Sequence, residues 1–296
     1  MSIPNDNLYA TIPYAATLPG ILGLGSIGVV YRHTADTVVK IPTRGLGTTA
    51  EELNEQIGSI QREAAVYNRL TNECPHIVKF LGSTPVSIVL EYAENGDLRD
   101  YLQKGWSYDN GTREWVRRVV PERERMLAWM KDIARGLAHI HSRRVLVNDL
   151  ASRNLLLDRD MRIKFCDFSH AIMENSMDCP LDQMGDDRFG LDYDIGKVGS
   201  VFYEIIAGRK ADYDGMLGVF ETETGEIEKT MEAPDIGDIW LGWVIEKCWE
   251  EEYEDAEELL EDLEGIELDE SEGDEGGLAK GSGAALTAED MDDVAN

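Results

Sequence analysis

The sequence predicts an α+β fold of two lobes, in which a small antiparallel sheet with one helix precedes a larger, mainly helical lobe. The first observation is that β-branched runs and glycine turns dominate up to Tyr92, with a single helical pattern among them. The second is that long apolar repeats at helical spacing dominate after Ala93, where the β-like runs are short. This change of character places the boundary between the lobes at residues 92 and 93.

The elements of the first lobe follow from hydrophobic period and turn residues. Residues 21–41 are rich in glycine and valine, and the polar stretch Arg32 to Asp36 separates two β-forming runs, which predicts a hairpin preceded by a glycine turn. Apolar residues recur at helical spacing between charges from Glu51 to Leu70. The predicted elements are strands at 29–31 and 37–39, a helix at 51–70, and strands at 77–81 and 87–92.

The second lobe is predicted from two long apolar helices. Pro121 suits the first turn of one, and Gly208 ends the other. The predicted helices span about 98–103, 121–140 and 194–207, with two more within 236–263, and short β-like runs lie at 145–147, 155–157 and 163–165.

The net charge of −30 over 296 residues argues against nucleic acid or an anionic membrane as a partner, because a polyanion would be repelled. The charge is uneven, and Lys280 is the only basic residue after Glu250. From about residue 269 the apolar periodicity stops. We therefore expect an acidic, disordered tail, with a docking site for a basic partner as the less favoured alternative.

The 4 cysteines lie far apart and form no C-x-x-C pair, which fits free thiols in a reducing compartment. The chain shows neither a signal peptide nor a run long enough to span a membrane. We expect a soluble cytoplasmic protein, with the nucleus left open. The expected divisions are a lead-in at 1–18, a sheet lobe at 19–92, a helical lobe at 93–268 and the tail at 269–296.

A glycine-rich run, G-L-G-S-I-G-V-V-Y, contains Gly23, Gly25 and Gly28. Glycines let backbone amides come close to phosphate oxygens, and the same spacing also marks dinucleotide sites. A dinucleotide site needs a strand, a turn and then a helix. Here β-branched residues follow the glycines, so the pattern is strand, turn, strand, which suits a flap over the phosphates of ATP.

Lys40 ends the next apolar strand, and Glu63 lies among apolar neighbours on the predicted helix. A lysine that holds the α- and β-phosphates needs an anion to fix its position, and a helix glutamate can supply it. Taken alone, Lys40 would be read as a surface lysine at a strand edge, and Glu63 as part of a solvated helix face beside Arg62.

The most specific motif is V-L-V-N-D-L-A-S-R-N-L-L-L, followed by F-C-D-F-S. Phosphoryl transfer needs a carboxylate that orients the substrate hydroxyl, and Asp149 fits that role. It also needs oxygen ligands for Mg²⁺, and Asn154 and Asp167 fit that role. Each aspartate alone is more often a turn residue, but chance is a poor account of the whole ordered set.

Together these motifs resemble the eukaryotic protein kinase superfamily over roughly residues 20 to 265. The resemblance implies the bilobal protein-kinase fold and transfer of the γ-phosphoryl group of ATP, with Mg²⁺, to a Ser/Thr or Tyr hydroxyl of a protein substrate. The V-K-I-P, N-D and C-W segments are similar to those of poorly characterised kinases of filamentous fungi. The residues that match the signature positions are Gly23, Gly25, Gly28, Lys40, Glu63, Asp149, Asn154 and Asp167.

The same resemblance implies the nucleotide contacts. Residues 88–93 resemble the hinge, where the backbones of Glu91 and Ala93 would bind the adenine edge, with Leu90 as gatekeeper, and Asp97 would face the ribose. Asp194 would brace the catalytic loop from the large helix. The residues that would sandwich the adenine are Val30, Val38 and Leu156.

The chain also departs from the family pattern. The usual H-R-D is replaced by V-N-D, and the missing arginine normally receives a phosphorylated loop. The only hydroxyls between Asp167 and Asp194 belong to Ser169, Ser176 and Tyr193. We therefore hypothesise that activity does not require loop phosphorylation.

The segment after Asp167 is short and carries no A-P-E, and the arginine that would pair with this glutamate is missing from Tyr253 to Leu263. ATP chemistry is thus better supported than recognition of a protein substrate. Arg153, in the order D-L-A-S-R-N, is closer to the tyrosine-kinase pattern and would steady the transferring phosphoryl group, or would be a surface charge. Specificity for Ser/Thr or Tyr stays open.

Two other functions remain alternatives. A pseudokinase or nucleotide-sensing module would bind ATP without transferring phosphate. The acidic tail favours it, and so does the altered segment after Asp167, the substrate segment, which in the family cradles the protein substrate. A small-molecule kinase on a related fold ranks last, because the hinge and the Asp194 helix look more like those of protein kinases.

Overall fold

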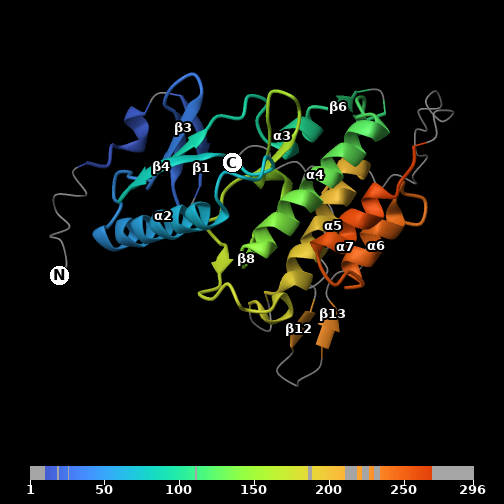
Figure 1. The fold of residues 1–296 in the computed structure, drawn as a ribbon. Helices are drawn as coiled ribbons and strands as arrows, with labels where there is room; N and C mark the ends of the chain where they lie inside the picture. Colours follow the sequence, from blue (N-terminus) through green and yellow to red (C-terminus); the bar gives the residue numbers. More distant parts are fainter. Residues whose placement is uncertain are drawn as a thin grey trace.

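A computed structural model of the chain describes residues 11–18, 20–25, 27–110, 112–185, 189–210, 219–221, 227–229 and 234–268 (Figure 1). The predicted α+β fold of two lobes is confirmed, with a sheet lobe followed by a helical lobe. The predicted acidic tail lies outside the described residues, and the expected domain boundaries stay predictions. Among the described residues, no helix is both long enough and apolar enough to cross a membrane.

The sheet lobe is built on one antiparallel sheet with the strand order β1-β2-β3-β5-β4. Helix α2 packs against it and buries the apolar stripe that its sequence predicts. Thr49 caps the start of α2 and forms a reciprocal capping box with Glu52, which satisfies exposed backbone amides. The elements are η1 (Ala15–Thr17), β1 (Ile21–Leu24), β2 (Val29–Arg32), β3 (Thr37–Ile41), α2 (Ala50–Leu70), β4 (Phe80–Thr84) and β5 (Ser87–Glu91).

The strand predicted at 77–81 is displaced. Strand β4 begins only at Phe80, because Ile77 instead forms a bridge with Phe165 of the helical lobe. The amide of Val78 donates to the Phe165 carbonyl at 3.0 Å, and the amide of Phe165 donates to the His76 carbonyl at 2.8 Å. The apolar run was therefore read correctly as extended, but its first residues join the two lobes.

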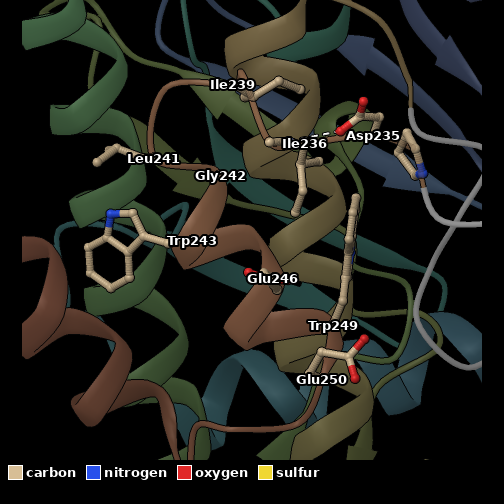
Figure 2. Close-up of a pocket in the computed structure, with 11 residues that line it drawn as sticks. Asp235, Ile236, Ile239, Leu241, Gly242, Trp243, Glu246, Trp249 and Glu250 are labelled. Atoms are coloured by element: carbon tan, nitrogen blue, oxygen red, sulfur yellow. Dashed lines mark hydrogen bonds between the residues drawn. The ribbon is translucent and has the colours of Figure 1, made fainter.

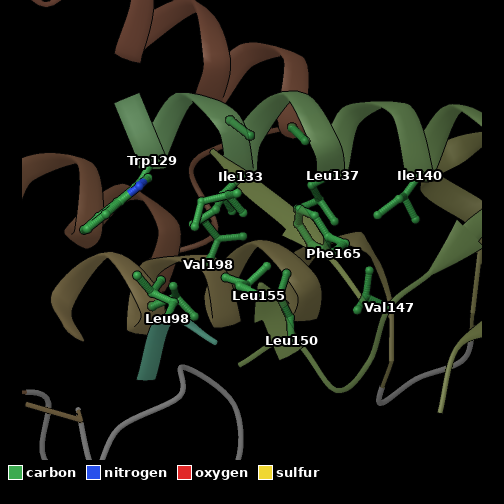
Figure 3. Packing of buried hydrophobic residues seen from close by; sticks show 14 of the residues in the cluster. Leu98, Trp129, Ile133, Leu137, Ile140, Val147, Leu150, Leu155, Phe165 and Val198 are labelled. Atoms are coloured by element: carbon green, nitrogen blue, oxygen red, sulfur yellow. The ribbon is translucent and has the colours of Figure 1, made fainter. Parts of the chain in front are cut away.

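The helical lobe is organised around α4 and α5. Helix α7 packs on α4, and α6 packs on α5. Figure 3 shows Ile133 and Leu137 pointing from α4 toward Phe165 and Leu155, all of which are buried. The helices are α3 (Leu98–Gln103), α4 (Arg123–Ser142), η2 (Ser152–Asn154), η3 (Leu181–Gln183), α5 (Leu191–Ala207), α6 (Gly242–Trp249) and α7 (Ala256–Glu264).

Short antiparallel pairs complete this lobe. The pairs β9–β10 and β8–β11 carry the polar residues of the candidate site or flank them. All four cysteines are free thiols, as expected for a chain without a disulfide framework. The strands are β6 (Trp106–Asp109), β7 (Glu114–Arg117), β8 (Val145–Leu146), β9 (Leu155–Leu157), β10 (Ile163–Phe165), β11 (Ile172–Met173), β12 (Val219–Glu221) and β13 (Ile227–Lys229).

The β6–β7 hairpin, which the sequence did not predict, caps the C-terminal end of α5. Gly208 ends α5 in the left-handed region, with φ of 74°. Its carbonyl accepts a hydrogen bond of 2.7 Å from the Trp106 indole. Arg117 donates to the carbonyls of Ile206 and Ile205 at 2.6 and 3.2 Å. A cation at the negative end of the helix dipole satisfies carbonyls that the helix leaves unpaired.

Candidate active site

The glycine run forms the turn between β1 and β2. The amide of Gly25 donates to the carbonyl of Gly28 at 2.9 Å and closes this turn. A Cβ atom at Gly28 would lie 2.6 Å from the Ile41 carbonyl oxygen, so no other residue fits there without a backbone shift. Gly23 lies in β1 with open space around it. The predicted arrangement of strand, turn and strand is thus present beside β3.

Lys40 is the point at which three distant segments meet. Its Nζ lies 2.8 Å from Glu63 Oε2 on α2 and 2.7 Å from Asp167 Oδ1 after β10. Lys40 is 5% exposed and Glu63 is fully buried, whereas the Asp167 side chain keeps 40% of its exposure. The sequence predicted both partners, and the structure brings them together. The carboxylate that remains accessible is the one expected to hold a metal.

The pKa values of this cluster reflect one lysine shared by two carboxylates. Burial alone would lower the pKa of Lys40, but Glu63 and Asp167 outweigh it and raise the pKa above its ordinary value. Burial raises the pKa of Glu63, and Lys40 offsets this only in part because Asp167 repels the same charge. Burial opposes ionisation of Asp167 too, yet Lys40 holds the pKa of that carboxyl below its usual range. Asp167 is therefore ionised at neutral pH.

Phe168, the residue after Asp167, is packed into an aromatic stack with α2. Asp167 has a positive φ of 57°, which turns the chain sharply. Phe168 is 1% exposed and meets Tyr67 of α2 edge-on, with ring centroids 5.0 Å apart. Tyr67 in turn stacks on Phe80 of β4 at 5.8 Å. This aromatic stack joins the helix that carries Glu63 to the residue beside Asp167.

The segment that bears Asp149 is braced from α5. The fully buried carboxylate of Asp194 accepts hydrogen bonds from the amides of Val147 and Asn148 at 2.7 and 2.8 Å. His141 lies 3.0 Å from the same carboxylate. The brace that the resemblance implied for Asp194 is thus present as a set of contacts.

Asp149 itself lies in a polar cluster. Its carboxylate accepts hydrogen bonds from the Arg153 guanidinium and from Asn154 Nδ2, the latter at 3.0 Å. Asn154 Nδ2 also donates to the Asp149 carbonyl at 2.8 Å. The Asp149 side chain keeps 32% of its exposure, so a hydroxyl from outside can reach it.

The residues present fit a magnesium ion. The amide nitrogen of Asn154 is engaged by Asp149, which leaves its oxygen as a ligand. The amide of Cys166 donates to the Asn154 carbonyl at 2.9 Å, and this brings Asp167 next to Asn154. Mg²⁺ takes one or two protein oxygens and completes its shell with phosphate and water. A partly exposed carboxylate and an amide oxygen meet that need.

The expected adenine contacts gather near the hinge. Val38 pairs with Leu90 across β3 and β5, and Leu156 forms a bridge with Asp97. Burial raises the pKa of Asp97, whose carboxylate caps α3 through the Asp100 amide at 2.9 Å. Among the described residues, no hydrogen bond engages the amide of Ala93.

Val30 and Glu91 are the two remaining residues predicted to contact the nucleotide. Val30 lies on β2 opposite Lys40 and is half-buried. The Glu91 side chain turns toward Lys164 of β10, at 2.8 Å, and its amide donates to the Lys79 carbonyl at 3.0 Å, so neither group is available to a nucleotide. These site assignments stay predictions.

The segment after Asp167 is held by residues that the sequence did not point to. Arg69, in the last turn of α2, donates to the Glu174 carbonyl at 3.2 Å. Arg144 donates to the Cys179 carbonyl. Asn148, which stands where the family has arginine, donates to the His170 carbonyl at 3.1 Å. All three acceptors are backbone oxygens, which carry no sequence signal.

A cavity of about 580 Å³ lies elsewhere, beside α6 (Figure 2). Its lining includes Ile236, Leu241, Trp243 and Trp249, with Asp235 hydrogen-bonded to the Gly237 amide at its edge. No residue predicted for the phosphate or adenine contacts lines this cavity. The cavity and the cluster of charged residues therefore lie in different places. Among the described residues, the polar cluster around Lys40 is the one whose chemistry supports a reaction.

Comparison with known proteins agrees with this geometry. The family described as protein tyrosine and serine/threonine kinase matches residues 17–261. The chain is 27% identical over 256 residues to the insulin-like growth factor 1 receptor of Xenopus laevis, covering 77% of this chain and 18% of the receptor. It is 30% identical over 237 residues to the serine/threonine/tyrosine-protein kinase HT1 of Arabidopsis thaliana, covering 74% of this chain and 56% of that protein.

A third relative shares a shorter stretch at higher identity. The serine/threonine-protein kinase CTR1 of Arabidopsis thaliana is 35% identical over 156 residues, which cover 50% of this chain and 17% of that protein. The matched part of the chain thus spans from about a sixth to about half of the length of these relatives. Because the family match covers most of the residues and both lobes, the chain belongs to the protein tyrosine and serine/threonine kinase family.

Proposed function

We propose that the chain is an active protein kinase, which transfers the γ-phosphoryl group of ATP to a Ser/Thr or Tyr hydroxyl of a protein. The observation that carries the proposal is Lys40, held between Glu63 and Asp167 at 2.8 and 2.7 Å. A buried lysine with two carboxylates is costly to maintain, and a chain used only as a scaffold has no chemical need for it.

Each residue has a role in this proposal. Lys40 holds the phosphates, and Glu63 keeps Lys40 in place. Asp149 orients the attacking hydroxyl, and Arg153 beside it balances negative charge. Bound Mg²⁺, held by Asn154 and Asp167, would supply charge neutralisation on the triphosphate. With little covalent work required of the protein, positioning and charge stabilisation provide most of the rate.

The charge of the whole chain bears on the class of substrate. The net charge of −30 fits a protein substrate better than nucleic acid. A basic partner for the acidic tail and a cytoplasmic location remain predictions from the sequence.

A pseudokinase is the second candidate, and the substrate segment favours it because A-P-E and its arginine partner are both missing. Transfer of labelled phosphate from ATP to a peptide library separates the two. We expect transfer by the natural chain and a loss of at least about 100-fold in Asp149→Asn, because the amide cannot orient the hydroxyl as the carboxylate does. Binding of ATP without transfer to any peptide, or to the chain itself, would establish the pseudokinase.

A further inference from the structure

Residues 11–18, which we call the N-terminal strap, lie against the sheet lobe and have no role in the proposed chemistry. Ile12 is 2% exposed and forms a small cluster with Leu53 and Ile57 of α2. The partly buried Val86, in the turn between β4 and β5, packs against the same cluster. This cluster is separate from the main core, which extends through both lobes, and from a second small cluster on the sheet.

The strap is attached at a second point, to Arg44, which follows the end of β3. The amide of Ala15 donates to the Arg44 carbonyl at 3.0 Å, and the Arg44 guanidinium donates to the Ile12 carbonyl at 3.0 Å. The same guanidinium lies over the Tyr14 ring, 4.4 Å from its centroid. Backbone and side-chain contacts therefore hold the strap at this point in both directions.

The two attachment points belong to the two elements that must meet in the site. Arg44 follows Lys40 closely after β3, and Ile57 precedes Glu63 on α2 by less than two turns. A link between the end of β3 and the first half of α2 limits how far the helix can swing away from the sheet. Glu63 reaches Lys40 only while α2 stays close to β3.

We infer that the strap is a positioning element of the kinase site, with Ile12 as the positioning residue that keeps Glu63 on Lys40. The inference deepens the proposed function and rests on it for its kinetic consequences. Ile12 touches neither the nucleotide nor the substrate in this account. It acts by favouring the arrangement of α2 in which the Lys40–Glu63 pair is formed.

The test uses the full chain with Ile12→Asp, which places a charge in the apolar cluster. The matched control is Leu46→Asp, because Leu46 is fully exposed in the same lobe. We expect Ile12→Asp to lower kcat about tenfold, as expected when the competent arrangement becomes a minor population, while KM for ATP changes less. Ile12→Leu should restore activity, and Leu46→Asp should leave it unchanged.

Two further measurements separate positioning from general damage. Combined with Glu63→Gln, Ile12→Asp should add no further loss, because both changes remove the same ion pair. Hydrogen exchange should speed up in the first half of α2, with the helical lobe unaffected. The inference would be overturned if the losses of kcat caused by Ile12→Asp and Glu63→Gln were fully additive. It would also be overturned if Ile12→Asp had the same kcat as Leu46→Asp.

Hydrogen exchange also separates this inference from the proposed function. If the natural chain transfers no phosphate, the proposed function fails, and the exchange rates of α2 still report on the strap. Unchanged exchange in Ile12→Asp would then show that the strap does not hold α2.

Discussion

Lys40 joins Glu63 through a buried ion pair and Asp167 through a partly buried one. Residues 169–185 are instead held by the β8–β11 pairing, by an apolar cluster that includes Met184, and by hydrogen bonds to backbone carbonyls. The two regions meet at Asp167 and differ in how much stability is lost when one interaction is removed. Removing one partner of a buried pair leaves an uncompensated charge and costs about 3–5 kcal/mol. Losing one ordinary hydrogen bond costs about 0.5–1.5 kcal/mol.

This difference explains why the resemblance to the family is uneven. The cluster around Lys40 depends on particular charges, and the residues expected to contact ATP or Mg²⁺ are all present, although the usual histidine and arginine before Asp149 are replaced. The segment after Asp167 depends on apolar packing and on donors that reach main-chain oxygens, and several residue types can provide either. Arg69, Arg144 and Asn148 do so here without the usual arginine before Asp149. The segment can therefore change while the cluster around Lys40 stays intact.

The largest expected effect is that of Lys40→Met. Transfer should fall at least about 100-fold, because a positioned charge on the phosphates is lost. The free energy of unfolding should also fall by about 3–5 kcal/mol at neutral pH, since Glu63 stays buried without its partner. Kinetics and denaturant unfolding would measure both, with Lys104→Met at an exposed position as the control.

The stability deficit of Lys40→Met should depend on pH. Burial raises the pKa of Glu63 in the folded chain, so the folded state binds this proton more tightly than the unfolded state. The variant should be most stable below the unfolded value near about 4.3 and lose stability as pH rises through the folded pKa. A deficit that is the same at acid and neutral pH would mean that Glu63 is not left as a buried charge.

A smaller effect is expected for Arg69→Ala. This change removes the donor to the Glu174 carbonyl and to the Arg143 carbonyl at 3.4 Å. We expect kcat/KM for a peptide to fall about tenfold, equivalent to about 1.4 kcal/mol, while KM for ATP stays within about twofold. Arg62→Ala, exposed on the same helix, is the control. A tenfold rise in KM for ATP as well would show that the segment after Asp167 and the cluster around Lys40 do not act separately.

The smallest effect should come from removing phosphate from the chain. The segment is already held by Arg69, Arg144 and Asn148, so phosphatase treatment should change activity by less than about twofold. Ser176→Ala should behave in the same way, because its hydroxyl accepts only a local hydrogen bond from the Asp178 amide. Loss of activity after phosphatase treatment would contradict the hypothesis.

The nucleotide side could be predicted from the sequence because its chemistry restricts residue types and their spacing. Lys40, Glu63 and Asp167 are far apart in the chain, yet each occurs in a recognisable local pattern. Arg69 and Arg144 could not be found in this way, since their partners are backbone oxygens that any residue provides. Ile12 is a single apolar residue outside any periodic pattern, so its burial depends on tertiary packing alone.

The element predictions failed for similar physical reasons. The run at 77–81 was correctly read as extended, but hydrophobic alternation does not say which lobe a strand residue pairs with. The β6–β7 hairpin was missed because it is held by long-range hydrogen bonds, from Trp106 and Arg117 to the last carbonyls of α5, which leave no local pattern in the sequence. The glycine that ends α5 at Gly208 was visible in the sequence, whereas the donors to its last carbonyls come from a distant segment.

The most direct test of the account is an equilibrium titration of ATP with and without Mg²⁺, in the natural chain and in Asp167→Asn. The account predicts that Mg²⁺ strengthens binding at least about tenfold in the natural chain, a difference of about 1.4 kcal/mol. In Asp167→Asn this gain should largely disappear, because the ionised carboxylate beside Lys40 is gone. Binding of ATP that is equally tight with and without Mg²⁺ in both chains would contradict it.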